Sequence, residues 1–305
     1  MSLADALATS GRSVPALSCA NDGVSAAITS EHVEKLATRG HVVVDDLLQP
    51  LTWRALRFEL EMLMMNADLH PPGQPDHVRS DVVCWLHGDD LELDRELTGG
   101  TADTYLAVTK RVVRQLRGVA HAVQRHVSQP LTAGESGSWG RDLQVPLSAM
   151  VACYDGAGTR YVQHVDNDGV TGDRRELSAV LYVNDANWDC EKDGGALRCH
   201  DVVGGYTDTY TDIAPVGGRL VLFKSRKVLH EVMPSQRRRF AITIWFEGPD
   251  EEWTGGALGP RRLGQNTDSE SQKPNHTKNK MRARTGCGTP LFYWERYFPG
   301  LGTRF

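Results

Sequence analysis

The sequence predicts a mainly β fold with flanking helices, in which the strands form a β-sandwich or jelly roll. The first observation is that short β-patterned runs, separated by turn residues, follow one another from residue 143 onward. The second is that the residues before 143 are largely of helical pattern. Helices that precede a series of strands are expected to pack on one face of an antiparallel barrel.

The composition is that of an ordinary globular protein. The chain has 305 residues, of which 40% are hydrophobic and 24% charged, and its formal net charge is −5. This mild acidity gives no reason to expect nucleic acid as a partner. The six cysteines are dispersed without a CxxC pair, and no apolar run is long enough to span a bilayer. We therefore expect reduced thiols and no membrane association, and we further expect a monomer in the cytoplasm, the nucleus or both.

The first helical segment begins at Ser30, the expected N-cap, and ends at Gly40. A short β run follows over residues 41–48. Apolar residues then recur at helical spacing over residues 51–66, which predicts a second, amphipathic helix. Three methionines of this helix are expected to fill the core: Met62, Met64 and Met65.

Turn residues replace the helical pattern after this point. Residues 67–78 contain a proline-rich run and are expected to form a loop. Residues 79–86 return to a strand pattern. A long helix is expected from about residue 103 to residue 129, and its apolar stripe consists of Val108, Val112, Leu116, Val119 and Val123.

The β-patterned runs of the second half span residues 147–154, 176–184, 196–199, 218–223 and 240–247. We expect one domain over residues 29–248, with its core in residues 143–247. Residues 1–28 are expected to form a flexible arm. Residues 249–305 are expected to form a linker and an aromatic tail, in which the basic run 273–284 is solvated and the aromatic run 291–298 docks on the domain or on a partner.

Three residues form a candidate metal site. His164 and Asp166 lie two residues apart in an extended segment, so their side chains point to the same side. His230 lies further on, between two β-patterned runs. Two histidines and one carboxylate on one face of a metal are the facial triad of non-haem Fe(II) oxygenases, which leaves other positions open. Each histidine alone is more simply interpreted as a surface or core residue, whereas the three together favour a metal.

Two alternatives to this site arise from the same residue types. His87 and Asp89 form a competing His-x-Asp pair, but this pair only follows a strand, whereas strands both precede and follow His164 and Asp166. A zinc hydrolase would use the same three ligands, but no general base is identifiable near His164 or His230.

Seven ordered motifs carry a resemblance to a known family: residues 150–154 (MVACY), 161–167 (YVQHVDN), 181–184 (LYVN), 193–198 (DGGALR), 212–215 (DIAP), 230–234 (HEVMP) and 239–245 (RFAITIW). This ordered set resembles the 2-oxoglutarate- and Fe(II)-dependent prolyl 4-hydroxylases, specifically the intracellular hypoxia-inducible-factor type. The resemblance covers roughly residues 143–247 and extends weakly to residues 79–85.

The resemblance implies a double-stranded β-helix of the jelly-roll or cupin-like kind, with iron held by His164, Asp166 and His230. It also implies that Arg239 binds the far carboxylate of 2-oxoglutarate, a task that suits the planar guanidinium. Strand alternation alone does not separate Arg239 from Arg237. Other positions that match the family are Tyr154 and Tyr182, whose hydroxyls reach the co-substrate, then Leu197, Thr243 and Trp245, which line its pocket, and Arg175 and Asp81, which meet the peptide substrate and the loop over it.

The same resemblance implies an enzyme. It would be a dioxygenase that uses Fe(II), 2-oxoglutarate and O₂, with ascorbate as reductant, to hydroxylate a prolyl residue in an intracellular protein. The expected target is a transcription factor of the hypoxia response, and a ubiquitin-ligase subunit of the Skp1 kind is the alternative. A non-catalytic peptide-binding module on the same fold is the interpretation from another class, and the complete ligand set with Arg239 argues against it.

Overall fold

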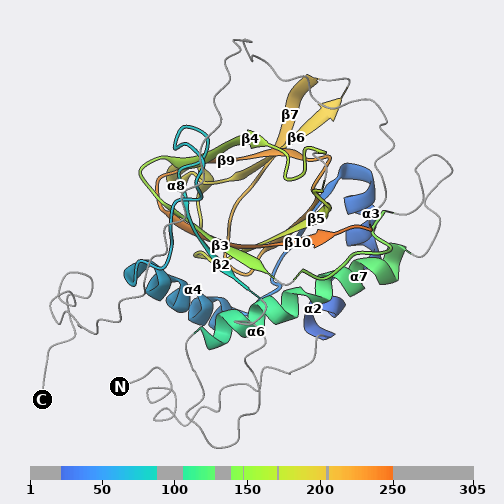
Figure 1. The fold of residues 1–305 in the computed structure, drawn as a ribbon, viewed down its shortest axis with the longest axis horizontal. Helices are drawn as coiled ribbons and strands as arrows, with labels where there is room; N and C mark the ends of the chain where they lie inside the picture. Colours follow the sequence, from blue (N-terminus) through green and yellow to red (C-terminus); the bar gives the residue numbers. More distant parts are fainter. Residues whose placement is uncertain are drawn as a thin grey trace, which may run out of the picture. The chain divides into compact units, whose positions relative to one another are not determined.

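Two antiparallel sheets stand opposite each other and form a barrel (Figure 1). The structure is a computed structural model that describes residues 22–87, 106–127, 139–146, 148–169, 172–203 and 206–249. All of these residues belong to the first of two compact units, Met1–Pro260. The predicted tail, with its basic and aromatic runs, lies outside the described residues from residue 250 onward, and so do residues 1–21 of the predicted arm.

The described residues contribute six strands to one sheet and four to the other. The larger sheet has the order β1-β8-β5-β10-β3-β2, with bounds β1 His41–Val44, β8 Leu220–Lys224, β5 Arg175–Tyr182, β10 Arg238–Glu247, β3 Ala149–Asp155 and β2 Val82–Leu86. The smaller sheet has the order β4-β9-β6-β7, with bounds β4 Thr159–His164, β9 Leu229–Ser235, β6 Leu197–Val203 and β7 Tyr206–Ile213.

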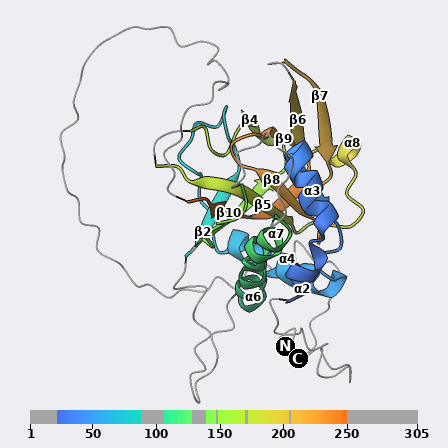
Figure 2. The same cartoon turned by 90° about the vertical axis from the view of Figure 1, so that its right-hand side faces the viewer.

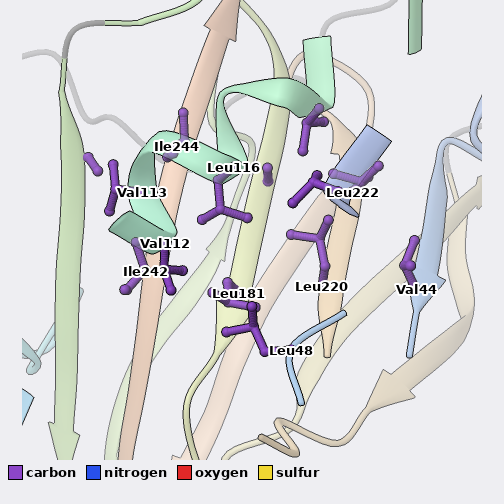
Figure 3. Packing of buried hydrophobic residues seen from close by; sticks show 14 of the residues in the cluster. Val44, Leu48, Val112, Val113, Leu116, Leu181, Leu220, Leu222, Ile242 and Ile244 are labelled. Atoms are coloured by element: carbon purple, nitrogen blue, oxygen red, sulfur yellow. The ribbon is translucent and has the colours of Figure 1, made fainter. Parts of the chain in front are cut away.

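Helices pack on the outer face of the larger sheet (Figure 1). Their bounds are α2 Asp22–Ala27, α3 Ser30–Arg39, α4 Pro50–Met65, α6 Ala107–Leu116 and α7 Gly118–Val127, and a single turn, α8 Cys190–Asp193, precedes β6. Figure 3 shows Val112, Val113 and Leu116 of α6 over Leu181, Ile242 and Ile244 of the sheet. No helix among the described residues is long and apolar enough to cross a membrane.

Strand alternation divides the interior into two cores. Along β10, Phe240, Ile242 and Ile244 face the helices and are buried against them. The alternate residues, among them Ala241 and Thr243, face the inside of the barrel. The second core fills the space between the sheets and contains Tyr154, Tyr182, Leu197, Phe223 and Val232. The polar residues of the site described below lie on this inner face.

The structure corrects four of the predictions about the helices. The expected helix over residues 103–129 is two helices, because the chain breaks before Gly118, and glycine disfavours an uninterrupted helix. The N-cap of α3 is Thr29 instead of Ser30, since the Thr29 and His32 side chains each accept a hydrogen bond from the other residue's backbone N–H. Met65 is 70% exposed and fills no core.

The fourth correction concerns the predicted arm. Val24 and Ile28 are buried, and α2 contacts α7, so residues 22–28 belong to the helical layer. Short apolar segments such as this one are easily mistaken for a tail, because so short a helix shows little periodicity.

Two leucines of α4 provide a test of the helical layer. Leu60 is fully buried, whereas Leu51, near the start of the same helix, is 67% exposed. We expect Leu60→Ala to lower the free energy of unfolding by about 2–5 kcal/mol, because it removes buried methyl groups and leaves a cavity. Leu51→Ala is the matched control and should stay within about 0.5 kcal/mol of the wild-type protein. Urea unfolding measures both, and equal losses would contradict this packing.

Candidate metal and co-substrate site

The three predicted metal ligands lie together. His164 ends β4, Asp166 follows it by two residues, and His230 is the second residue of β9. β4 and β9 are antiparallel neighbours in which His164 pairs with His230. The Nε2 atoms of His164 and His230 lie 3.6 Å and 3.7 Å from Oδ1 of Asp166, and one ligand atom from each residue lies within 4.8 Å of the other two. The three side chains could therefore hold one divalent metal ion.

Backbone contacts set the orientation of both imidazoles. Nδ1 of His164 lies 2.8 Å from the carbonyl oxygen of Val162, and Nδ1 of His230 lies 3.0 Å from that of Val228. A proton on each Nδ1 leaves the lone pair of Nε2 for a metal, an arrangement that metal-binding histidines commonly show. Burial lowers the pKa of His230 to about 4, so this imidazole is neutral at physiological pH, as a ligand must be.

The Asp166 carboxylate is held by its other oxygen. Oδ2 accepts hydrogen bonds from the Ser178 hydroxyl at 2.5 Å and from the Trp245 indole nitrogen at 2.9 Å, which leaves Oδ1 beside the two imidazoles. Burial alone would raise the pKa of Asp166, but the His164 and His230 imidazoles and the Ser178 hydrogen bond together keep this pKa below its ordinary value. Asp166 is therefore ionised and has one oxygen, Oδ1, available for a metal.

Sequence reasoning missed Ser178 and its neighbour Ser225, whose hydroxyls lie 2.8 Å apart in the interior. The available signal was a serine inside the apolar run of β5. A polar residue on a buried strand needs a partner, but the sequence does not show which one. In the structure Ser178 lies opposite Trp245 in the ladder, and both side chains donate to the same oxygen of Asp166.

The side chains of Arg79, Tyr161 and His164 form a stack that supports the His164 imidazole. The Tyr161 ring stacks on the His164 ring, with centroids 3.7 Å apart and an interplanar angle of 18°. The Arg79 guanidinium in turn lies over the Tyr161 ring, 4.7 Å from its centroid. Residues three apart on a regular strand point to opposite faces, and an irregularity in the β4–β9 ladder between Tyr161 and His164 allows the stacking. Sequence reasoning did not single out Tyr161.

Arg239 lies buried on the inner face of β10. It is 2% exposed, its Nε donates to the Gly195 carbonyl at 2.8 Å, and its guanidinium lies 4.9 Å from the ring centroids of both Tyr154 and Tyr182. Among the described residues it has no carboxylate partner within ion-pair distance. A buried cation without a counter-ion is unfavourable, which indicates that a ligand supplies the anion.

The Tyr182 hydroxyl gives a second sign of a missing ligand. It is fully buried near Arg239 yet has no hydrogen-bond partner of good geometry in the described part of the chain. Burial raises its pKa to about 12, so it remains a hydroxyl donor. Leu197 and Thr243 are also buried on the inward faces of their strands. The Trp245 indole nitrogen is already engaged, because it donates to the Asp166 carboxylate. An acid with one carboxylate on Arg239 and its other end on a metal fits this set of donors.

The structure separates the two arginines that strand alternation left equivalent. Arg237 precedes β10, its side chain is 40% exposed, and it forms ion pairs with Asp185 and Asp193. Arg239 is the second residue of β10 and points into the barrel. Arg238 begins the strand and pairs with Asp155 and Glu61.

Arg175 and Asp81, the two residues expected to contact the peptide, differ in exposure and in whether their polar atoms are free to bind it. Arg175 is partly exposed, pairs with Asp173 at 2.5 Å and lies 5.7 Å from the Trp245 ring centroid, so it lies beside the site. Asp81 is only 2% exposed, and both of its oxygens accept hydrogen bonds from Arg79, at 2.6 and 2.7 Å. Asp81 is thus placed to hold Arg79, with neither oxygen left over for a peptide.

The competing pair gains no support from the described residues. His87 is exposed directly after β2, and Asp89 lies outside the described residues.

Asn167, which was predicted only as part of a motif, has a structural role. Its buried amide donates to the carbonyls of Asp173 and Arg175 and holds the segment that follows Asp166.

The ligand set leads to a prediction about metal binding. We expect Asp166→Ala to abolish tight binding of Fe(II), because it removes the charged ligand and leaves two neutral imidazoles. His87→Ala is the control and should leave the affinity unchanged. Metal titration of the metal-free chain, with Mn(II) as an air-stable probe, measures both. Loss of binding in His87→Ala together with retention in Asp166→Ala would mean that the metal lies elsewhere.

Comparison with known sequences agrees with this geometry. Residues 149–247 match the family described as the 2OG-Fe(II) oxygenase superfamily. The chain is 34% identical over 235 residues to a hypoxia-inducible factor prolyl hydroxylase of Caenorhabditis elegans, covering 73% of this chain and 28% of the relative. It is 42% identical over 104 residues to prolyl hydroxylase EGLN3 of Homo sapiens, covering 34% of this chain and 41% of the relative. The chain thus spans less than half the length of these relatives.

Solved structures share the fold. A prolyl-4-hydroxylase of Pseudomonas putida is 28% identical with a TM-score of 0.53, over 72% of this chain and 97% of that chain. A Trichoplax adhaerens prolyl hydroxylase, solved in complex with a hypoxia-inducible factor oxygen degradation domain peptide fragment, is 22% identical with a TM-score of 0.56, over 74% of this chain and 90% of that chain. The predicted fold class is confirmed. Residues 149–247 thus correspond to a 2OG-Fe(II) oxygenase domain, and the chain is similar in sequence to hypoxia-inducible factor prolyl hydroxylases.

Proposed function

We propose that this chain is an Fe(II)- and 2-oxoglutarate-dependent dioxygenase that hydroxylates a prolyl residue of an intracellular protein. The observation that carries the proposal is the pairing of two incomplete sites inside one barrel. One is the cluster of His164, Asp166 and His230, and the other is the buried Arg239 with the unpartnered Tyr182 hydroxyl. A 2-oxo dicarboxylate that chelates iron at one end and meets Arg239 at the other completes both.

The protein's part in the reaction is to bind, orient and exclude water. His164, Asp166 and His230 would hold Fe(II), with Ser178 and Trp245 fixing the carboxylate. Iron with 2-oxoglutarate and O₂ supplies the oxidising power, so that a C–H bond is hydroxylated while the keto acid is converted to succinate and CO₂, and ascorbate is the expected reductant.

The remaining residues of the pocket act on the co-substrate. Arg239 binds its far carboxylate through the two terminal nitrogens, since Nε is already engaged by Gly195. The hydroxyls of Tyr182 and Tyr154 donate to the same carboxylate, and Leu197 and Thr243 line the path between it and the metal.

The proposed substrate is a peptide segment with a proline, in a protein of the oxygen-sensing response. The relatives named as hypoxia-inducible factor prolyl hydroxylases and the Trichoplax complex support this choice. Arg175 begins β5 and lies near Trp245, and the loop of residues 67–78 ends on β4, where the Val78 carbonyl accepts from the Val162 amide, so we expect the peptide to approach the metal near these two segments. Incubation with a proline peptide, 2-oxoglutarate, Fe(II) and O₂ should give succinate and a peptide that carries one added oxygen atom.

Two other results would replace this proposal. Peptide hydrolysis that needs metal but no O₂ would indicate a hydrolase. Tight peptide binding without succinate formation would indicate a binding module. A peptide in which alanine replaces the proline is the control and should remain unmodified.

A test of the co-substrate site compares the two arginines. We expect Arg239→Ala to weaken binding of 2-oxoglutarate by on the order of 2–5 kcal/mol, because it removes the partner of a buried carboxylate. Arg237→Ala is the control and should change the affinity little, since Arg237 is exposed and paired with Asp185 and Asp193. Calorimetric titration with 2-oxoglutarate measures both. The reverse ranking would show that the co-substrate binds outside the barrel.

The loop of residues 67–78 has fixed ends and an irregular middle, which limits how it could move. Leu69 is buried, and His70 and Val83 exchange backbone hydrogen bonds of 2.8 Å. At the other end, the Val78 carbonyl accepts from the Val162 amide at 2.9 Å, next to the metal ligands of β4. Only residues 71–77 between these anchors remain to contact a peptide.

We therefore expect residues 71–77 to position the peptide. Replacing them with a Gly-Ser segment of equal length should lower peptide hydroxylation at least tenfold, the ~1.4 kcal/mol of one lost positioning contact. Conversion of 2-oxoglutarate without peptide should survive, because the ligands and Arg239 are untouched. Mass spectrometry of the peptide and a succinate assay separate the two effects. Unchanged hydroxylation would show that the loop is idle and would shift substrate contact toward Arg175.

A further inference from the structure

A second cavity, of about 840 Å³, lies at the seam between the two sheets, away from the candidate metal site. β1 is an edge strand of the larger sheet and β7 is an edge strand of the smaller one, so neither sheet closes over this seam. The cavity is bounded by the end of α3, β1, the strands β6 and β7, and the turn between β8 and β9. Figure 2 shows α3 beside β6 and β7. None of the metal-ligand candidates and none of the residues around Arg239 line it.

The inner wall of this seam cavity carries groups that donate hydrogen bonds. Val42 and Val44 pack into the helix-side core, so His41 and Val43 face the cavity. In the β6–β7 ladder, Asp201 pairs with Thr209 and Cys199 pairs with Thr211. Since Cys199 is buried on the inner face of β6, Thr209 and Thr211 lie on the corresponding face of β7, where both are exposed and line the cavity. His41, Thr209 and Thr211, which carry one imidazole and two hydroxyls, therefore line the same cavity.

The charge around the cavity has the opposite sign to that of the chain. The chain carries a formal net charge of −5. The cavity is lined by four basic residues, Lys35, Arg39, Lys224 and Lys227, and by one acid, Asp201. Exposed cations gathered at a concave surface raise the local concentration of anions. The positive charge is therefore concentrated at this cavity, in contrast to the net negative charge of the whole chain.

Two contacts show which of these cations are already engaged. Lys35 already pairs with Glu31 at 2.7 Å on the solvent side, and an exposed pair of this kind is weak. The C-terminal end of α3 would repel an anion, but the Lys224 ammonium donates to the Ala37 carbonyl at 2.9 Å and offsets that end. Arg39 and Lys227, both exposed, form no ion pair among the described residues. They are the cations left for a ligand.

We propose that the seam cavity binds a small polyvalent oxyanion, that is, a molecule with a phosphate or polycarboxylate group. Arg39 and Lys227 hold its charge at the rim, and His41, Thr209 and Thr211 donate hydrogen bonds to its oxygens. Asp201 is the one group that opposes such a ligand. The cavity volume lies in the range of ordinary small-molecule sites. One residue connects the cavity with the candidate metal site, because Val228 lines the cavity and its carbonyl is the partner of His230 Nδ1.

The test is an NMR titration of the imidazole of His41 in the full, metal-free chain, with inorganic phosphate in one series and citrate in another, at constant ionic strength. We expect a saturable shift of the His41 signal in at least one series. The double variant Arg39→Ala/Lys227→Ala should weaken binding roughly tenfold. Its matched control, Arg54→Ala/Lys192→Ala, removes two exposed cations elsewhere and should bind as the wild type does.

Two further variants distinguish binding in the seam cavity from a damaged fold and from binding at Arg239. Asp201→Asn should tighten binding, because it removes the opposing charge, and a damaged fold would not produce a gain. Arg239→Ala should leave binding unchanged, so the result does not depend on the proposed enzymatic function. The proposal is overturned if neither anion gives a saturable shift, if both double variants weaken binding equally, or if Arg239→Ala abolishes binding, which would place the anion in the co-substrate pocket.

Discussion

The pairing of β4 with β9 is the interaction on which the site depends, because it joins ligands that are far apart in the sequence. Its register places His164 opposite His230, and both imidazoles then face the carboxylate that follows β4. A slip of one residue would turn His230 to the other face of the sheet and destroy the cluster. The irregularity between Tyr161 and His164 is equally necessary, since it brings two residues three apart onto one side and lets their rings stack. The ladder thus sets both the position of the ligands and their support.

A second constraint is the charge of Arg239 inside the barrel. The fold surrounds this guanidinium with two tyrosine rings and one carbonyl, which stabilise it only in part. The neighbouring Tyr182 hydroxyl is unpartnered as well. A core built for stability alone would not leave a buried cation and a buried hydroxyl in this state, and such departures concentrate at functional sites. Binding of the proposed dicarboxylate would therefore relieve two unfavourable burials at once, and would couple occupancy of the pocket to the stability of the barrel.

The parts of the site that the sequence predicted depend on neighbours along one strand, whereas the missed parts depend on contacts between strands. His164 and Asp166 were predictable because alternation along one strand places them on one face. Arg239 was separated from Arg237 by the family resemblance alone, since the two share parity and only the start of β10 distinguishes them. Ser178 and Tyr161 were missed because their roles arise across strands, from the register with Trp245 and from an irregular ladder. The start of the first helix was misplaced for a different, local reason: the Thr29 cap is completed by His32, an uncommon capping partner.

The support of His164 also connects the metal side of the barrel with the peptide side. Asp81 fixes Arg79 through two hydrogen bonds, Arg79 lies over Tyr161, and Tyr161 stacks on His164. Backbone hydrogen bonds tie the same segment to β4, since Ser80 donates to the Arg160 carbonyl and Val162 to that of Val78. A substrate bound against the loop before Arg79, as proposed above, would therefore act on a stack of three side chains that ends at His164, a candidate metal ligand. Because packed aromatic rings and bidentate ion pairs have little freedom to adjust, a peptide held at this loop would be coupled to the geometry of the candidate metal site.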